Sequence, residues 1–149
     1  MKKIVIYTDG ACSGNPGIGG YAGVLQYQGR EKIVSGGEKE TTNNRMELMA
    51  VIAALECIKE PCEVDVYSDS AYVVNAFLQN WTSGWILNGW KTSGKKQVQN
   101  VDLWQRLLLQ TERHKVTWHK VKGHADNELN NRCDELARGE IEKIRQSIE

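Results

Sequence analysis

Two short apolar runs sixty residues apart constrain the fold of this chain most strongly. The runs IVIYTDG and VDVYSDS are rich in β-branched and aromatic residues, and they stop at Asp9 and Asp69 respectively. Such runs predict buried strands. Side chains at the carboxyl ends of parallel strands project into one crevice, so we expect the two aspartates to lie together. A turn or a helix N-cap would explain either aspartate taken alone.

Hydrophobic periodicity along the rest of the chain predicts an alternation of strands and helices. Strands are expected at residues 4–8, 21–29, 31–37, 64–68 and 114–121. Helices are expected at residues 45–59, 71–79, 101–109 and from 131 onward, with a C-terminal tail that frays over about 145–149. This order predicts an α/β protein with a mixed sheet and helices packed on its faces.

The composition fits one domain over residues 1–149, because 149 residues with 40% hydrophobic content can bury a substantial core. No apolar stretch approaches the roughly 18 residues of a membrane span, so we expect no membrane contact and a cytoplasmic protein. The cysteines lack the spacing of a zinc site. We expect reduced thiols at Cys12, Cys57, Cys62 and Cys133.

The net charge of zero hides a basic middle segment. Residues 81–122 carry eight Lys and Arg against two Asp and Glu, whereas residues 1–80 carry seven against ten. Trp81, Trp85 and Trp90 are interleaved with these basic residues. A solvated surface would explain the charge but does not need the tryptophans, so the segment favours nucleic-acid binding.

Two further acids lie on the apolar sides of predicted helices. Glu47 shares a helical stripe with apolar residues at spacings of four, seven and eleven, where an acid is costly unless something binds it. Asp134 is aligned with the apolar stripe of the last helix. Each has a local alternative: Glu47 would cap Asn44 in a capping box, and Asp134 would pair with Arg138.

We predict that Asp9, Glu47, Asp69 and Asp134 converge on one site. Two unit charges about 4 Å apart repel by roughly 4 kcal/mol at an effective dielectric constant near 20, so such a cluster requires divalent cations. Carboxylate ligands without paired Cys or His favour a hard ion such as Mg²⁺ or Mn²⁺. A site of this kind beside a basic surface indicates phosphodiester chemistry.

Five segments of the chain together resemble bacterial type 1 ribonuclease H over residues 4–137. They read YTDGACSGNPG, TTNNRMELMA, YSDSAYV, GWKTSGKKQVQNVDLW and VKGHADNELNNRCDELA. The resemblance implies a ribonuclease H-like fold, with a five-stranded mixed β-sheet flanked by α-helices. It also implies metal-dependent hydrolysis of the RNA strand of RNA–DNA hybrids, which leaves 5′-phosphate and 3′-hydroxyl ends.

The resemblance also implies roles in the reaction. The metal-binding positions of the family hold Asp9, Glu47, Asp69 and Asp134, with one or two Mg²⁺ ions per site and Mn²⁺ as a substitute. His124 occupies the proton-transfer position, which suits an imidazole with an ordinary pKa near 6.5. A solvated loop histidine is the alternative for His124.

Other positions match the family's contacts to the hybrid. Its 2′-hydroxyl and minor-groove positions hold Cys12, Asn15, Asn43 and Asn44, for which turn and helix-cap duty is the alternative. Its DNA-phosphate positions hold Thr42 and Asn100. A handle over about residues 81–100 offers Trp81 and Trp85 to the DNA strand and attracts phosphates through Lys91, Lys95 and Lys96.

Two other functions would explain part of this sequence pattern. A non-catalytic module that binds hybrid or duplex RNA would explain the basic segment, but acids without metal facing phosphates would oppose its binding. Related integrases and junction resolvases share the fold, usually with three carboxylates and without this handle. We expect an enzyme that acts as a monomer on an RNA–DNA hybrid, with no obligate protein partner.

Overall fold

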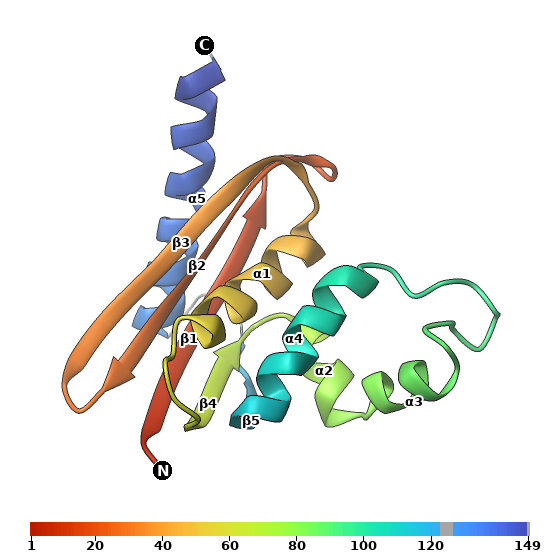
Figure 1. Cartoon of the computed structure of the whole chain (residues 1–149). Coiled ribbons are helices and arrows are strands. Elements are labelled where there is room, and N and C mark those ends of the chain that lie inside the picture. Colours follow the sequence, from red (N-terminus) through yellow and green to blue (C-terminus); the bar gives the residue numbers. More distant parts are fainter. Residues whose placement is uncertain (123–126, 149) are drawn as a thin grey trace.

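The computed structural model describes residues 1–122 and 127–148, in which a five-stranded sheet has the order β3-β2-β1-β4-β5 (Figure 1). The strands are β1 Lys3–Cys12, β2 Gly17–Tyr27, β3 Arg30–Thr41, β4 Glu63–Ser68 and β5 Lys115–Lys120. The helices are α1 Asn43–Glu56, α2 Ala71–Leu78, α3 Trp81–Leu87, α4 Val101–Arg113 and α5 Glu128–Ile148. The predicted α/β class with a five-stranded mixed sheet is confirmed.

Strand β1 lies at the centre of the sheet and pairs in parallel with β4 and antiparallel with β2. The parallel pairing ends at Tyr7 and Tyr67, whereas the antiparallel pairing continues to Cys12. The prediction that the first strand ends at Asp9 is therefore wrong, because the ladder with β2 extends it. Asp9 still lies beyond the last parallel pair, as a site at the ends of the parallel strands requires.

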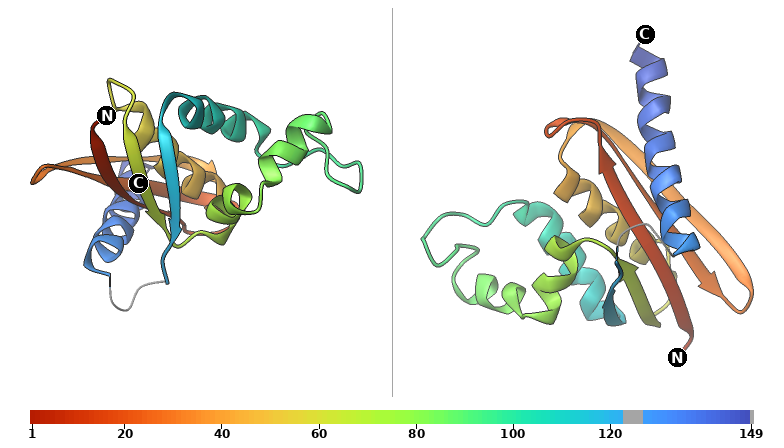
Figure 2. Two further views of the ribbon diagram at one scale, coloured as in Figure 1. Left: turned by 90° about the horizontal axis from the view of Figure 1, so that it is seen from below. Right: turned by 180° about the vertical axis from the view of Figure 1, so that it is seen from behind.

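Helices cover the two faces of the sheet unequally. Helix α1 packs on β1, β2 and β3 from one side, and α5 packs on the same three strands from the other (Figures 1 and 2). Helix α4 packs on α1 and so forms an outer layer on that side. Because α1 is enclosed between the sheet and α4, apolar residues occupy most of its circumference.

The core is centred on α1 and on Trp104 of α4. Leu48, Ile52 and Leu55 of α1 are fully buried, as is Trp104. The indole N–H of Trp104 donates a hydrogen bond to the Tyr72 hydroxyl at 3.1 Å, which satisfies the polar atom of this buried side chain. The one polar atom of this central indole is therefore satisfied within the apolar core.

Helix α3 is the element that the sequence does not predict. The segment is short and contains Gly84, so it lacks a clear helical period. Trp85 packs edge-on against Trp104 with ring centroids 5.1 Å apart, and this tertiary contact supports the helix. Across the described residues, no helix combines the length and apolar character that crossing a bilayer would take.

The boundaries of the long helices also differ from the prediction. Helix α4 extends to Arg113 rather than residue 109. Helix α5 begins at Glu128 rather than 131, because the Asn127 side-chain oxygen accepts a hydrogen bond from the Asn130 backbone N–H at 3.0 Å. Helix α1 ends at Glu56, before the residues 57–59 that the prediction included.

Gly20 of β2 lets α5 approach the sheet closely. A Cβ atom at this position would collide with the backbone carbonyl oxygen of Ala137. We predict that Gly20→Ala lowers the free energy of unfolding by about 1–3 kcal/mol in urea denaturation, because the helix must move away. A Cβ atom at Gly139, on α5, would meet no neighbouring atom. Gly139→Ala is therefore expected to raise the free energy of unfolding by about 0.5–1 kcal/mol. Equal effects of the two substitutions would contradict this packing.

Candidate active site

Three acidic side chains from three separate segments meet just beyond the point where the parallel pairing of β1 with β4 ends. Asp9 comes from β1, Glu47 from α1 and Asp69 from the turn between β4 and α2. One carboxylate oxygen of each lies within 4.8 Å of those of the other two. Asp9 and Glu47 are only 4% and 6% exposed, and Asp69 is half-buried. The structure thus brings together three of the four predicted carboxylates.

Gly10 allows α1 to lie directly against β1 at this site. A Cβ atom at Gly10 would stand 2.5 Å from the Glu47 backbone nitrogen, so a larger residue would push the helix away. The Gly10 N–H donates to Asp9 Oδ1 at 3.0 Å. The Asp-Gly pair that reads as a turn signal in the sequence therefore serves close packing between a strand and a helix.

Glu47 points into the site instead of capping its own helix. The N-cap of α1 is Thr42, whose hydroxyl oxygen accepts a hydrogen bond from the Arg45 N–H at 3.3 Å. The capping-box alternative for Glu47 with Asn44 is therefore wrong. Among the described residues, Glu47 Oε1 has no hydrogen-bond partner although it is buried. A buried carboxylate oxygen without a protein partner fits a role as a ligand to a cation.

Burial and mutual repulsion raise the pKa values of two acids at this site. Burial, followed by the charges of Asp69 and Asp134, raises the pKa of Asp9 to about 7. Burial and then the charges of Asp9 and Asp69 raise the pKa of Glu47 well above its ordinary value. A nearby divalent cation would lower both pKa values, because its positive charge favours the ionised carboxylates. Ionisation of these acids is therefore unfavourable without a cation, which is the chemistry of a hard-metal site.

Asp134 lies beside this cluster without being one of its three members. Its carboxylate pairs with Arg138 at 2.7 Å, four residues along α5, so the surface-pair alternative is present. Its charge nevertheless reaches Asp9, whose pKa it raises. Among the described residues, the predicted convergence of four carboxylates is thus seen for three, and the fourth, Asp134, is paired with Arg138.

Comparisons with known proteins place the chain in a family. A family model described as RNase H matches residues 1–142. The chain belongs to the ribonuclease H family. It is 65% identical over 143 residues to ribonuclease H of Acetivibrio thermocellus, which covers 96% of this chain and 97% of that protein. It is 62% identical over 137 residues to ribonuclease H of Chlorobaculum parvum, which covers 92% and 94%.

Solved structures of ribonucleases H share the fold. LC9-RNase H1, a type 1 RNase H with the type 2 active-site motif, has a TM-score of 0.84 at 30% identity over 95% of this chain and 73% of that one. LC11-RNase H1 in complex with an RNA/DNA hybrid has a TM-score of 0.71 at 27% identity over 95% and 98%. The predicted family, fold and enzyme class, an endonuclease of the ribonuclease H type, are confirmed.

The residues predicted to read the 2′-hydroxyl all flank the start of α1 or face it. Asn15 Oδ1 accepts a hydrogen bond from the Asn43 N–H at 3.1 Å, so Asn15 also helps to begin this helix. Cys12 Sγ lies within hydrogen-bond distance of the Thr41 carbonyl oxygen, at 3.4 Å. Asn44 is half-buried in the first turn. These residues therefore help to form the start of α1, and their role in binding the substrate stays a prediction.

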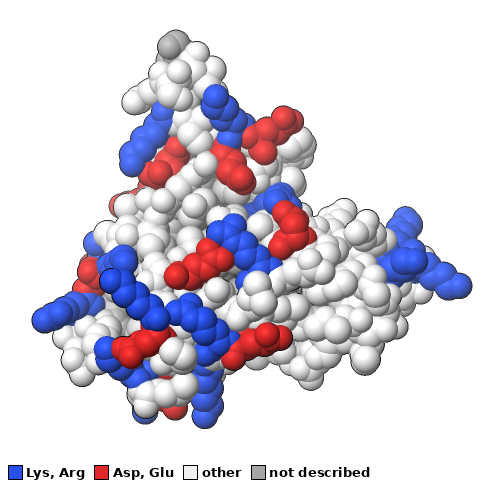
Figure 3. Space-filling view, viewed as in Figure 1, with Lys and Arg blue, Asp and Glu red and all other residues white. Residues whose placement is uncertain are grey.

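The handle of this ribonuclease H packs on the core at one end and carries exposed lysines at the other. Trp81 is 38% exposed and tilts over Trp85 with ring centroids 6.4 Å apart, while Trp85 packs on the core. The segment 88–100 contains no acid and carries three exposed lysines, Lys91, Lys95 and Lys96. Figure 3 shows Lys and Arg side chains gathered at the far end of the handle.

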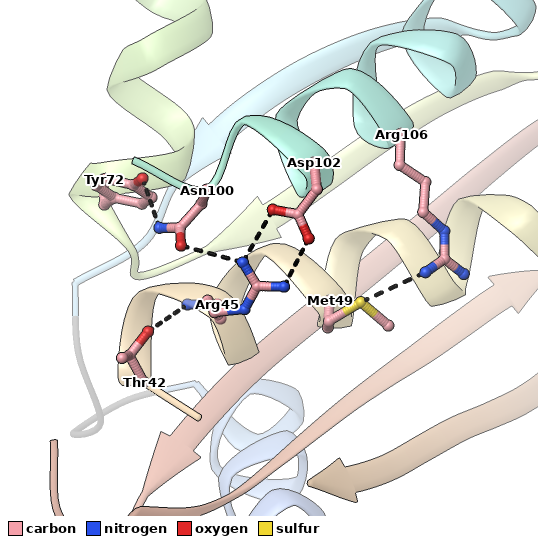
Figure 4. Close-up of polar contacts among 7 residues, drawn as sticks. All are labelled: Thr42, Arg45, Met49, Tyr72, Asn100, Asp102 and Arg106. Atoms are coloured by element: carbon pink, nitrogen blue, oxygen red, sulfur yellow. Dashed lines mark hydrogen bonds and ion pairs between the residues drawn. The ribbon is translucent and has the colours of Figure 1, made fainter. Parts of the chain in front are cut away.

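Sequence reasoning missed the contacts around Asn100, one of the two residues predicted to bind a DNA phosphate. Arg45 forms a bidentate ion pair with Asp102 at 3.0 and 2.8 Å and also donates to Asn100 Oδ1 at 3.2 Å (Figure 4). These partners lie on α1 and α4, more than fifty residues apart, so no spacing in the sequence could signal the contact. His124, the predicted proton-transfer residue, lies outside the described residues.

The pKa of Asp9 predicts how pH changes the stability of the metal-free protein. Its folded-state pKa of about 7 exceeds an unfolded value near 3.9, so the folded state binds more protons between those limits and stability falls as pH rises. In EDTA, we expect Asp9→Asn to be more stable than the native chain by about 1–3 kcal/mol at pH 8 and by little at pH 4.

Urea denaturation at pH 4, 6 and 8 measures this difference. Glu112→Gln replaces an exposed acid of α4 and serves as the matched control, with no pH-dependent gain expected. A gain from Asp9→Asn that is the same at every pH would contradict the burial and repulsion assigned to this carboxylate.

Proposed function

We propose that the cluster of Asp9, Glu47 and Asp69 binds Mg²⁺ and that the chain hydrolyses the RNA strand of RNA–DNA hybrids, leaving 5′-phosphate and 3′-hydroxyl ends. The observation that carries the proposal is the meeting of three carboxylates, two of them buried, in a chain of the ribonuclease H family. The hybrid bound to the related LC11-RNase H1 supports the choice of substrate.

The donor set fits a hard divalent cation. All three groups offer oxygen, and Glu47 Oε1 is buried without a partner among the described residues. Oxygen ligands favour Mg²⁺, with Mn²⁺ as a substitute, and the number of acids is compatible with one or two ions. Such an ion would activate a water molecule and stabilise charge on the leaving oxygen of the phosphodiester.

The side chains of this protein would hold and orient the substrate and move protons. Asp9 of β1 and Asp69, which directly follows the neighbouring parallel strand β4, would supply two sides of the ligand set, and Glu47 would complete it from α1. Asp134 is proposed as the fourth ligand, which requires its release from Arg138. His124 is proposed to protonate the leaving 3′-oxygen.

The remaining predicted residues would recognise the hybrid. Asn15, Asn43 and Asn44 with Cys12 would read the 2′-hydroxyl, which distinguishes RNA from DNA at a given site. Trp81 and Trp85 would pack on the DNA strand, while the lysines at the handle end attract its phosphates without sequence preference.

We also propose that the chain acts in the cytoplasm as a monomer with no obligate partner. Its four cysteines are free, as expected of a protein in a reducing compartment.

Cleavage of a labelled RNA strand tests the function. We expect cleavage when that strand is paired with DNA, and none when it is paired with RNA or single-stranded. EDTA and the substitution Asp9→Asn should each abolish cleavage, because both remove the metal or its ligand. Gel analysis of the products would show 5′-phosphate ends. Binding of the hybrid without cleavage in either Mg²⁺ or Mn²⁺ would contradict the proposal and favour the binding-module alternative.

A further inference from the structure

A hollow of about 360 Å³ lies between α5 and the end of β1. Cys12 and Ser13 line it on the β1 side, and Arg138 and Arg145 line it on the α5 side. Figures 1 and 2 show that α5 continues beyond the ends of the strands, so this helix forms one long wall. Cys12 follows Asp9 by three residues, or about 10 Å along the strand, so the hollow adjoins the candidate active site.

The side of α5 that faces the hollow also carries the predicted fourth metal ligand. Asp134, Arg138 and Arg145 are separated by four and seven residues, spacings that place side chains on one side of a helix. At a rise of about 1.5 Å per residue, Arg138 lies about 6 Å from Asp134 along the helix axis. Asp134 is close enough for its charge to act on Asp9. A phosphate bound at Arg138 would therefore be a near neighbour of a phosphate bound at the acids.

The ion pairs of α5 distinguish Arg138 from the other cations of this helix. Each of the other three pairs with an acid outside the candidate active site: Arg132 with Glu31, Lys143 with Glu140 and Arg145 with Glu142. Arg138 instead pairs with Asp134, at 2.7 Å. A metal ion that takes Asp134 as a ligand would therefore remove the partner of Arg138 and leave the partners of the other three in place.

Arg138 can leave this pair at little cost. Its side chain is 64% exposed, whereas the side chain of Asp134 is 21% exposed. Ion pairs of this kind on a helix surface contribute little to stability, because water and salt screen the two charges. The guanidinium also stays hydrated when it turns away from Asp134. It can then reach into the hollow that the side chain already lines.

The chemistry of the two walls selects a phosphate of the RNA strand. A guanidinium presents two parallel N–H donors, which match two oxygens of a phosphate as well as those of a carboxylate. Cys12, on the opposite wall, occupies a position predicted to read the 2′-hydroxyl, a group that the DNA strand lacks. The exposed hydroxyl of Ser13 adds a further donor on that wall. The strand that passes this wall is therefore the RNA strand.

We propose that Arg138 is a substrate-binding residue, which releases Asp134 when a divalent cation binds there and then holds an RNA-strand phosphate close to the cleaved bond. The inference rests on the proposed function and adds to it a contact on α5. Arg138 thereby couples the two ligands, because the cation frees the guanidinium for the phosphate and the phosphate frees the carboxylate for the cation. By linkage, each ligand strengthens the binding of the other through this residue.

Mn²⁺ titration of the protein without hybrid tests the release of Asp134. The ion must displace Arg138 in the native chain, so we expect Arg138→Gln to bind Mn²⁺ roughly two- to fivefold more tightly. Arg132→Gln is the matched control, because it removes a cation that lies near Asp134 in the sequence but pairs with Glu31. In about 0.15 M salt, charges more than about 8 Å apart are largely screened, so the control should show a much smaller gain.

Hybrids with one methylphosphonate in the RNA strand test the phosphate contact. The neutral linkage is moved stepwise along both sides of one mapped cut, and its sugar is 2′-deoxy in the substituted strand and in the matched phosphodiester control. In the native chain, kcat/KM for this cut should fall about tenfold at one position near the cut, and Arg138→Gln should cause a similar loss with the unmodified hybrid.

At that one position, the effects of Arg138→Gln and of the methylphosphonate should not add, because both remove the same contact. Lys143→Gln removes an exposed cation of the same helix that pairs with Glu140, and it should leave the native scan unchanged. The contact is overturned if Arg138→Gln and the methylphosphonate add at every position. The release of Asp134 is overturned if Arg138→Gln and Arg132→Gln gain equally in Mn²⁺ affinity. If the native chain binds Mn²⁺ but cleaves no hybrid, the proposed function fails instead.

Discussion

Repulsion among three carboxylates held within 4.8 Å of one another is the constraint on which the rest of this structure depends. Burial of Asp9 and Glu47 intensifies that repulsion, since little water is present to screen it. The scaffold must therefore hold each acid firmly in the absence of a cation. Pairing of β1 with β2 and β4, together with the enclosed position of α1, supplies this rigidity.

Much of the fold follows from local patterns in the sequence. The runs around Tyr7 and Tyr67 are apolar and β-branched, and they form the parallel central pair that was expected. Helix α3 could not be predicted, because it is supported by the packing of Trp85 on Trp104 of α4 and not by a helical period of its own. The end of β1 was misplaced for a related reason: its partner β2 decides how far the strand extends.

The candidate site was predictable to a similar degree. Asp9 and Asp69 were predicted as site residues because each follows an apolar run that forms a strand. Glu47 was predicted because it lies on the apolar stripe of a helix, where an unpaired buried acid is costly. The pairing of Asp134 with Arg138 was visible as a spacing of four on a helix. The ion pair between Arg45 and Asp102 could not be predicted from the sequence, because it joins two helices and depends on their tertiary packing.

A titration of the native chain with Mn²⁺, followed by the EPR signal of the free ion, tests the central claim that the carboxylates form a metal site. The account predicts that the native chain binds Mn²⁺ at least about tenfold more tightly than Glu47→Gln, because the buried carboxylate supplies a ligand and a negative charge. Glu60→Gln, an exposed acid beyond the opposite end of the sheet, should bind like the native chain. Equal affinity of the native chain and Glu47→Gln would contradict the account.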